Sequence, residues 1–245
     1  MRIGIVGPGR LGRSLAILFE AAGQHVQLFG RTAVPSGDVL LLTVPDGQIA
    51  EVAAAIPVGP IVLHCSGAKG MDVLRPHPVV GSFHPLMSFP GPEVAVPSVE
   101  GVPVAVAGDP AALAAARSLA ETLKMVPVEV LGDRRLYHAA AVMAGNFATV
   151  LLADAVEVLT AAGVEPQKAL EMLTPLALAS IANASTGPAN ALTGPVVRND
   201  VATLEAHRTA LREAGLEEHA RVYDTLTGRA QKLLRAKRTP PSDQS

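Results

Sequence analysis

Two histidines, an asparagine and a serine are the polar residues of this 245-residue chain that are best placed to do chemistry. Ser66 follows a short apolar run, and His84 precedes Pro85, which restricts the histidine backbone to extended conformations. His138 and Asn146 are eight residues apart in an alanine-rich stretch, so on a helix they share one face. Because histidine can exchange protons near neutral pH, His84 and His138 are candidate proton donors. Asn146 and Ser66 are candidate groups for positioning a substrate.

Each candidate also has a structural alternative. His84 could stabilise only a turn, and His138 could be a satisfied histidine in a core or an interface. Near the C-terminal end, Arg198 could bind a substrate carboxylate or serve a subunit interface. Asp200 is predicted to be a helix N-cap, and His207 to pack within or between subunits. The sequence leaves the roles of these last three residues open.

A glycine-rich turn near the start of the chain has the spacing of a dinucleotide site. It fits G-x-G-x-x-G, directly after the predicted strand 2–6 and at the start of a helix. The three glycines would allow the tight turn, the approach of a pyrophosphate, and close packing of helix on strand. Arg10 and Arg13 stand in the first helical turn without a carboxylate, and a bound phosphate would stabilise that arrangement. The residues predicted to bind the cofactor here are Gly7, Pro8, Gly9, Arg10, Leu11 and Gly12.

The end of the second predicted strand favours NADP over NAD. NAD sites usually place a carboxylate there for the ribose hydroxyls. This chain has Arg31 and Thr32 instead, which could bind a ribose phosphate. Asp46 is predicted to cap the next helix rather than to act as an acid. Further residues expected to line the cofactor, where the third and fourth strands end, are Val44, Pro45 and Ser66.

Strands and helices alternate in the first half of the chain, and helices alone fill the second. This order predicts an α/β fold, a doubly wound, mostly parallel Rossmann sheet followed by an all-helical C-terminal domain. We expect an NADP-binding domain over 1–133, a helical dimerisation and substrate domain over 134–237, and a disordered tail over 238–245. Predicted strands are 2–6, 25–29, 39–44, 61–64, 81–83, 102–107 and 126–130. Predicted helices are 11–22, 48–55, 111–123, 136–162, 166–184, 201–214 and 217–237.

Composition argues against several other classes of protein. With 20 basic and 22 acidic residues there is no basic excess for nucleic acid. Cys65 is the only cysteine, so an intrachain disulfide is impossible and a reducing compartment is expected. No histidine, cysteine and carboxylate cluster has the spacing of metal ligands. The most apolar stretch, 139–153, is shorter than a bilayer span, so we expect a cytoplasmic protein without a membrane segment.

The chain resembles Rossmann-like proteins whose C-terminal half is the domain of unknown function 2520. These are relatives of pyrroline-5-carboxylate reductase and of the 6-phosphogluconate dehydrogenase-like superfamily. The resemblance implies NADP as cofactor and a helical domain that forms a homodimer. It is carried by residues 7–12, Val44 to Asp46, Ser82 to Leu86, Tyr137 to Ala141, Gly145, Asn146, Leu192 to Val196, Arg198 to Asp200, Thr203 and His207.

One position departs from the wider superfamily. Its hydroxyacid dehydrogenases carry a catalytic lysine four residues before an asparagine, where this chain has Val142. Oxidation of β-hydroxyacids by that mechanism is therefore not expected. The hypothesis that remains is an NADP-dependent oxidoreductase acting on a small C=O, C=N or hydroxyl substrate. The alternative is a non-catalytic NADP-binding sensor or partner-binding dimer, and the sequence names neither the substrate nor the direction of reaction.

Overall fold

The computed structural model describes residues 1–30 and 33–238, and its contacts divide the chain into two units. The first unit is Met1–Asn146, and the second begins at Phe147. This division falls later than the domain boundary expected near Arg134, because helix α4 (Arg134–Ala144) makes its contacts with the first unit. Of the predicted disordered tail, all but Arg238 lies outside the described residues.

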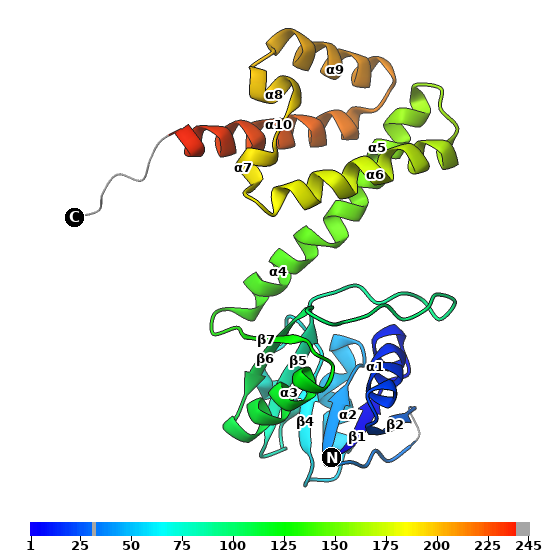
Figure 1. Cartoon of the computed structure of the whole chain (residues 1–245), viewed down its shortest axis with the longest axis vertical. Helices are drawn as coiled ribbons and strands as arrows, with labels where there is room; N and C mark the ends of the chain where they lie inside the picture. The colour runs from blue at the N-terminus through cyan, green and yellow to red at the C-terminus, as the bar shows by residue number, and fades with distance from the viewer. Residues whose placement is uncertain (31–32, 239–245) are drawn as a thin grey trace, which may run out of the picture. The chain divides into compact units, whose positions relative to one another are not determined.

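The first unit is built on a seven-stranded sheet, counted over the described residues (Figure 1). The strand order is β2-β1-β3-β4-β5-β6-β7, and every neighbouring pair is parallel except β5 with β6. This arrangement confirms the predicted mostly parallel α/β sheet. The strands are β1 (Arg2–Val6), β2 (His25–Phe29), β3 (Val39–Leu42), β4 (Ile61–His64), β5 (Val80–Pro85), β6 (Pro103–Gly108) and β7 (Val126–Glu129).

Apolar side chains cover both faces of this sheet, as the continuous apolar runs in its strands require. One cluster includes Leu15 and Phe19 of α1 together with Leu119 of α3. The other, on alternate strand residues, includes Ile49 of α2 and Leu74 of η2. Burying each such side chain stabilises the fold by about 1.5–3 kcal/mol. The helices of this layer are α1 (Arg10–Ala21), η1 (Asp46–Gln48), α2 (Ile49–Ala55), η2 (Met71–Leu74) and α3 (Pro110–Thr122).

The single antiparallel pair follows from the connection between β5 and β6. A parallel connection needs a crossover, usually a helix. Residues 86–102 form no helix in the structure, so β6 returns beside β5 in the opposite direction. Gly81 lies against Gly108 at one end of this pair, and Pro85 against Val104 near the other. The carboxyl end of β5, with His84, therefore stays at the same edge as the ends of β1, β3 and β4.

The second unit is entirely helical over its described residues. The helix expected over 136–162 is two helices, because Gly145 ends α4 and α5 begins at Asn146. Helix α6 has the predicted bounds and continues through Pro175. The remaining helices are α5 (Asn146–Ala161), α6 (Pro166–Ala184), α7 (Pro188–Ala191), α8 (Gly194–Arg198), α9 (Val201–Glu213) and α10 (Glu217–Arg238).

Helices α4 and α5 together form the one described helical stretch, Arg134–Ala161, that is long and apolar enough to cross a membrane by length and composition. None of its most apolar window is buried within the chain.

Candidate functional site

The glycine turn between β1 and α1 leaves an open space above its second glycine. Gly7 has φ of 112°, a conformation that side chains disfavour. A Cβ added to Gly12 would lie 2.0 Å from the carbonyl oxygen of Gly7 and 2.5 Å from Thr43 Oγ1. A Cβ on Gly9 would meet nothing within 4 Å. The first and third glycines are thus required by the protein itself, whereas the second borders empty space that a ligand could occupy.

The start of α1 is suited to an anion. Gly9 is its N-cap, no side chain caps its first turn, and that turn contains no acidic residue. The Arg13 Nε donates to the Pro8 carbonyl over 2.7 Å, which holds this guanidinium beside the turn. Uncapped N–H groups at a helix N-terminus favour phosphate. A cleft of about 680 Å³ lies here, lined by Pro8, Gly9, Arg10, Arg13, Ser14, Ile17 and residues 90–96.

Thr43 fixes the neighbouring strand end to the turn. Its hydroxyl lies 2.8 Å from the Gly7 carbonyl oxygen and 3.0 Å from that of Val6, and its N–H donates to Val6. Strand β3 ends at Leu42 and not at the predicted Val44, because its neighbour β1 ends at the paired residue Val6, before the turn at Gly7. Val44 and Pro45 then lie just past the end of β3, and their contact with a cofactor stays a prediction. Arg31 and Thr32, predicted to select NADP, lie outside the described residues.

Ser66, two residues after β4, is buried, and its hydroxyl and N–H make four hydrogen bonds. Its hydroxyl donates to Asp46 Oδ2 over 2.8 Å and accepts from the N–H groups of Ala68 and Lys69. Its own N–H donates to His64 Nδ1. The hydroxyl therefore shapes the loop after β4, and its proposed contact with substrate or nicotinamide stays a prediction. Asp46 does not cap η1 as predicted, because its carboxylate accepts this bond from Ser66 instead.

The structure brings His84 and His138 together, although 54 residues of sequence separate them. Their ring centroids are 6.1 Å apart, and His84 Nδ1 lies 2.7 Å from the hydroxyl of Tyr137. Burial, followed by repulsion from His138 and Arg134, lowers the pKa of His84 to about 4. Asp46 opposes this shift weakly. His84 is therefore a neutral imidazole at physiological pH.

Gly67 makes this approach of the two histidines possible. A Cβ there would lie 2.5 Å from His138 Nδ1 and 3.1 Å from both Cε1 and Nε2 of His84. His138 Nδ1 is buried and finds no hydrogen-bond partner among the described residues. The absence of a side chain at position 67 thus lets the loop after β4 touch both rings.

Arg134 joins helix α4 to this loop. Its Nη2 donates to the Ser66 carbonyl over 2.8 Å, and its guanidinium lies 5.9 Å from the centroid of the Tyr137 ring. Within the described chain it forms no ion pair, and its Nε and Nη1 atoms are buried without a partner. Burial lowers the pKa of Arg134 and raises that of Tyr137, and the guanidinium partly offsets the rise at Tyr137.

Three residues of this cluster were not among the candidate site residues from the sequence: Arg134, Tyr137 and Gly67. Arg134, Tyr137 and His138 are spaced i, i+3, i+4 and so share one face of α4, a signal that was available. Gly67 gives no signal without the position of β5. Asn146 is exposed at the start of α5, and its predicted role in the site stays a prediction.

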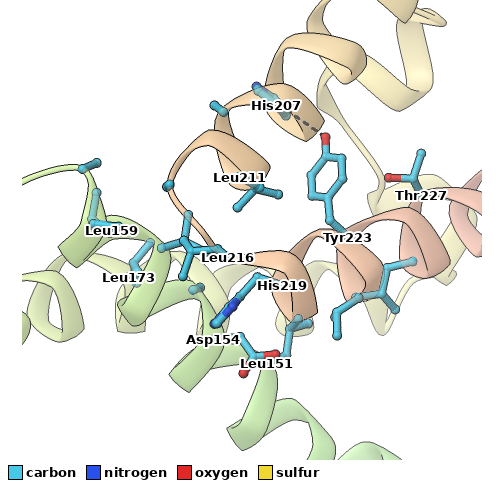
Figure 2. Close-up of a pocket in the computed structure, with 18 of the residues that line it drawn as sticks. Leu151, Asp154, Leu159, Leu173, His207, Leu211, Leu216, His219, Tyr223 and Thr227 are labelled. Carbon is cyan, nitrogen blue, oxygen red and sulfur yellow. Dashed lines mark hydrogen bonds between the residues drawn. The ribbon is translucent and has the colours of Figure 1, made fainter.

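The helical unit contains an apolar cavity of about 970 Å³, and 18 of its lining residues are drawn in Figure 2. The exposed His207 at its wall places Nδ1 2.8 Å from the Tyr223 hydroxyl, and its predicted packing role stays a prediction. His219 Nε2 lies 3.1 Å from a carboxylate oxygen of Glu157. Asp200 is the predicted N-cap of α9, since its carboxylate accepts from the N–H and hydroxyl of Thr203.

Comparison with solved structures supports the architecture. Protein BF3122 of Bacteroides fragilis, provisionally described as an NADP oxidoreductase, aligns with TM-score 0.78 and 21% identity over 94% of this chain and 98% of its own. A reductive aminase from Aspergillus terreus, in complex with NADPH and ethyl levulinate, aligns with TM-score 0.65 and 16% identity, covering 96% and 94%. A 1-pyrroline-5-carboxylate reductase from Streptococcus pyogenes aligns with TM-score 0.62 and 14% identity, covering 95% and 98%. At these identities the likeness establishes the fold.

Sequence comparison adds one curated relative and one family. A glycerol-3-phosphate dehydrogenase [NAD(P)+] from Synechococcus sp. (strain JA-3-3Ab) is 29% identical over 134 residues, 48% of this chain. The match spans only 41% of that relative's length. Residues 102–230 match the family model described as "Domain of unknown function (DUF2520)". Because the match covers more than half of the 245 residues, the chain belongs to the DUF2520 family.

Proposed function

We propose that this protein is an NADP-dependent oxidoreductase that reduces a C=O or C=N group of a small molecule. The observation that carries the proposal is the open space beside Gly9 at the uncapped start of α1, on the same sheet edge as the His84 cluster. In open α/β sheets, ligands bind beyond the carboxyl ends of the strands. Three of the relatives support the same class of reaction: the reductive aminase, the 1-pyrroline-5-carboxylate reductase and the glycerol-3-phosphate dehydrogenase.

The space beside Gly9 fits the pyrophosphate of a dinucleotide. Gly9 offers space beside the uncapped N–H groups of α1, and Arg10 and Arg13 supply positive charge. Arg31 and Thr32 would hold the ribose phosphate of NADP, and Val44 and Pro45 would line its path. When bound, NADPH supplies the hydride.

The His84 cluster would handle the reacting group. The carboxyl ends of β1 and β5 are three strand spacings apart, about 14 Å. A dinucleotide lying along this edge from the glycine turn would bring its nicotinamide toward β4 and β5. There His84 would donate a hydrogen bond to the substrate C=O or C=N. Ser66 and Arg134 would hold the loop and helix that carry the site, and His138 would exclude water from it.

Two measurements test this proposal. Calorimetry should find NADPH bound at micromolar concentrations, with NADH weaker. A panel of 2-oxo acids, ketones and cyclic imines should then contain at least one compound that oxidises NADPH, and His84→Gln should lower that rate. Tight NADPH binding without any turnover would favour the sensor alternative, and failure to retain either nucleotide at millimolar concentration would refute both.

We also propose that the helical unit functions as a homodimer. Its buried apolar residues, over the described part, are only Ala169, Leu204, Leu211 and Ala220. By contrast, Leu176, Leu178 and Ile181 of α6 are 63%, 64% and 59% exposed. A helix with apolar residues on all sides is normally buried. The further exposed apolar residues of α5 and α6 are Phe147, Val150, Leu151, Leu170 and Met172.

Light scattering coupled to size exclusion tests the assembly. The parent protein should have twice the mass of one chain, 25.2 kDa. Leu176→Glu should shift it toward monomer, whereas Glu171→Gln, on the same helix, should not. A parent protein that is monomeric at micromolar concentration would contradict this proposal.

A further inference from the structure

We propose that Tyr137 is the proton source of the reaction, that it acts through the imidazole of His84, and that Arg134 holds and stabilises it. This inference rests on the proposed reductase function, which requires one proton for each hydride transferred. It assigns functions to two residues, Tyr137 and Arg134.

The geometry of Tyr137 and His84 suits proton transfer. The hydroxyl and Nδ1 are 2.7 Å apart, which is a good hydrogen-bond distance. If the phenol donates to Nδ1, the neutral imidazole must carry its own proton on Nε2. In the other tautomer the phenol O–H would need a different acceptor, and no other is found within the described chain. The arrangement therefore directs an N–H of His84 away from Tyr137, on the side where Gly67 lies.

His84 cannot serve as the acid by itself. It is faced by Tyr137, His138 and Arg134 from α4 and by Asp46 from η1, while His64 lies on the neighbouring strand. Burial and the positive charges outweigh Asp46 and lower the pKa of His84 to about 4. At pH 7 roughly one molecule in a thousand would carry an imidazolium. A neutral imidazole can deliver its Nε2 proton only if another group supplies a proton at Nδ1.

The transfer balances as follows. As the hydride forms a new C–H bond, the C=O oxygen, or the C=N nitrogen, takes the proton from His84 Nε2. At the same time His84 Nδ1 takes the proton of the Tyr137 hydroxyl, so the imidazole ends as its other tautomer and stays neutral. The phenolate left on Tyr137 then takes its proton back from His84 Nδ1, while Nε2 takes a proton from solvent, which restores the starting tautomer. The sum is one hydride from NADPH and one proton from solvent added to the substrate.

Arg134 provides what a transient phenolate needs. Its guanidinium lies over the Tyr137 ring at 5.9 Å, is anchored to the Ser66 carbonyl, and has no carboxylate partner in the described chain. Its charge is therefore available to the phenolate. The guanidinium lowers the pKa of the phenol against the effect of burial. We regard Arg134 as a positioning residue, because it acts through Tyr137.

His138 lies outside this relay. Its ring meets that of His84 at a centroid distance of 6.1 Å, and its Nδ1 is buried against Gly67 without a partner. No hydrogen bond connects it to Tyr137 or His84 among the described residues. This leaves one path for the proton, from Tyr137 to His84.

The first test needs neither cofactor nor substrate. The chain has two tyrosines and no tryptophan, so in the Tyr223→Phe variant Tyr137 carries the only phenol whose ionisation can be followed by ultraviolet absorption. In that background, ultraviolet titration should show that Arg134→Met raises the phenol pKa of Tyr137, while Arg134→Lys, which keeps the charge, restores it toward the parent value. Histidine ¹⁵N spectra at pH 7 should place the proton of His84 on Nε2. An unchanged or lower phenol pKa in Arg134→Met, or a proton on Nδ1, would overturn the relay.

The second test uses turnover of whichever compound oxidises NADPH. Tyr137→Phe should lower kcat by about 10²-fold or more, with KM changed only a few-fold. Tyr223→Phe, in the helical unit and outside the His84 cluster, is the matched control and should keep parental kcat. NADPH oxidation that is unaffected by Tyr137→Phe would refute the relay and leave the reductase proposal intact. Absence of any NADPH binding would refute the proposed function, whereas the titrations above would still report on the pair.

Discussion

Replacing Gly9 with alanine separates the folding role of the glycine turn from its binding role. Gly9 has φ of −74° and ψ of −172°, an extended conformation that any residue can adopt. Its added Cβ would meet nothing within 4 Å. The main cost to folding is the weaker N-cap preference of alanine, which we place below about 1 kcal/mol. The variant should therefore unfold close to the parent temperature.

The effect of Gly9→Ala on the affinity for NADPH should be much larger. If a pyrophosphate lies against the amides that start α1, the new methyl group occupies its space, and forcing the two together costs about 1–3 kcal/mol. That cost corresponds to a roughly 5- to 150-fold weaker affinity. Titration calorimetry with NADPH measures it directly, and a thermal melt of the same sample reports the stability.

A matched control is available in α10. Gly228 also has nothing within 4 Å of an added Cβ, and it lies inside a helix, where alanine stabilises. Gly228→Ala should bind NADPH like the parent and melt slightly higher. If Gly9→Ala binds NADPH with the parental affinity, no nucleotide rests on this turn, and the assignment of the whole site fails.

Three further outcomes follow from the same structure. Gly12→Ala, whose Cβ would lie 2.0 Å from the Gly7 carbonyl oxygen, should lose about 1–3 kcal/mol of unfolding free energy in urea titrations, and parental stability would contradict the packing described. Ser66→Ala leaves two loop N–H groups without their acceptor and should cost about 1–3 kcal/mol, with faster hydrogen exchange at those amides; unchanged exchange would show that the hydroxyl does not hold the loop. Burial, mainly, lowers the pKa values of His64 and His84 to about 4, so the unfolded state binds more protons below pH 6.5 and stability should fall as pH decreases from 6.5 to 4, by at most roughly 3 kcal/mol for each group. His84→Gln should flatten this dependence in urea melts between pH 7 and 4, and an equally steep fall in the variant would show that His84 is not the group responsible.

Most of the sheet could be predicted from the sequence because each buried strand is a short apolar run ended by a turn. The run at 61–64 became β4 with the same bounds. The run at 39–44 became β3 only as far as Leu42, because its neighbour β1 ends at Val6, before the turn at Gly7. Such a boundary depends on a strand elsewhere in the chain, which no local pattern contains.

The candidate site was predictable only where its chemistry is local. The glycine turn carries its own signal, since three glycines, a strand and a helix lie within a dozen residues. The cluster around His84 carries only part of its signal locally, in the helical spacing of Arg134, Tyr137 and His138, because it forms only when the end of β5, the loop after β4 and one face of α4 meet. Gly67 illustrates the difference, because its lack of a side chain leaves space for the rings of His84 and His138, and its own conformation is not what matters.

Position 142 does not need a lysine if Tyr137 and His84 supply the proton of the reaction. Val142 is one helical turn beyond His138 on α4, and it has no group that can exchange protons. Tyr137, on the same helix, reaches His84 at the end of β5 and with it forms a pair that exchanges protons while both members remain neutral at pH 7. A lysine would add a second cation to α4, about two helical turns beyond Arg134, which has no carboxylate partner in the described chain. If the relay operates, introducing Val142→Lys into the parent should therefore not raise NADPH oxidation, and a gain in rate would mean that the site still depends on the lysine chemistry of the wider superfamily.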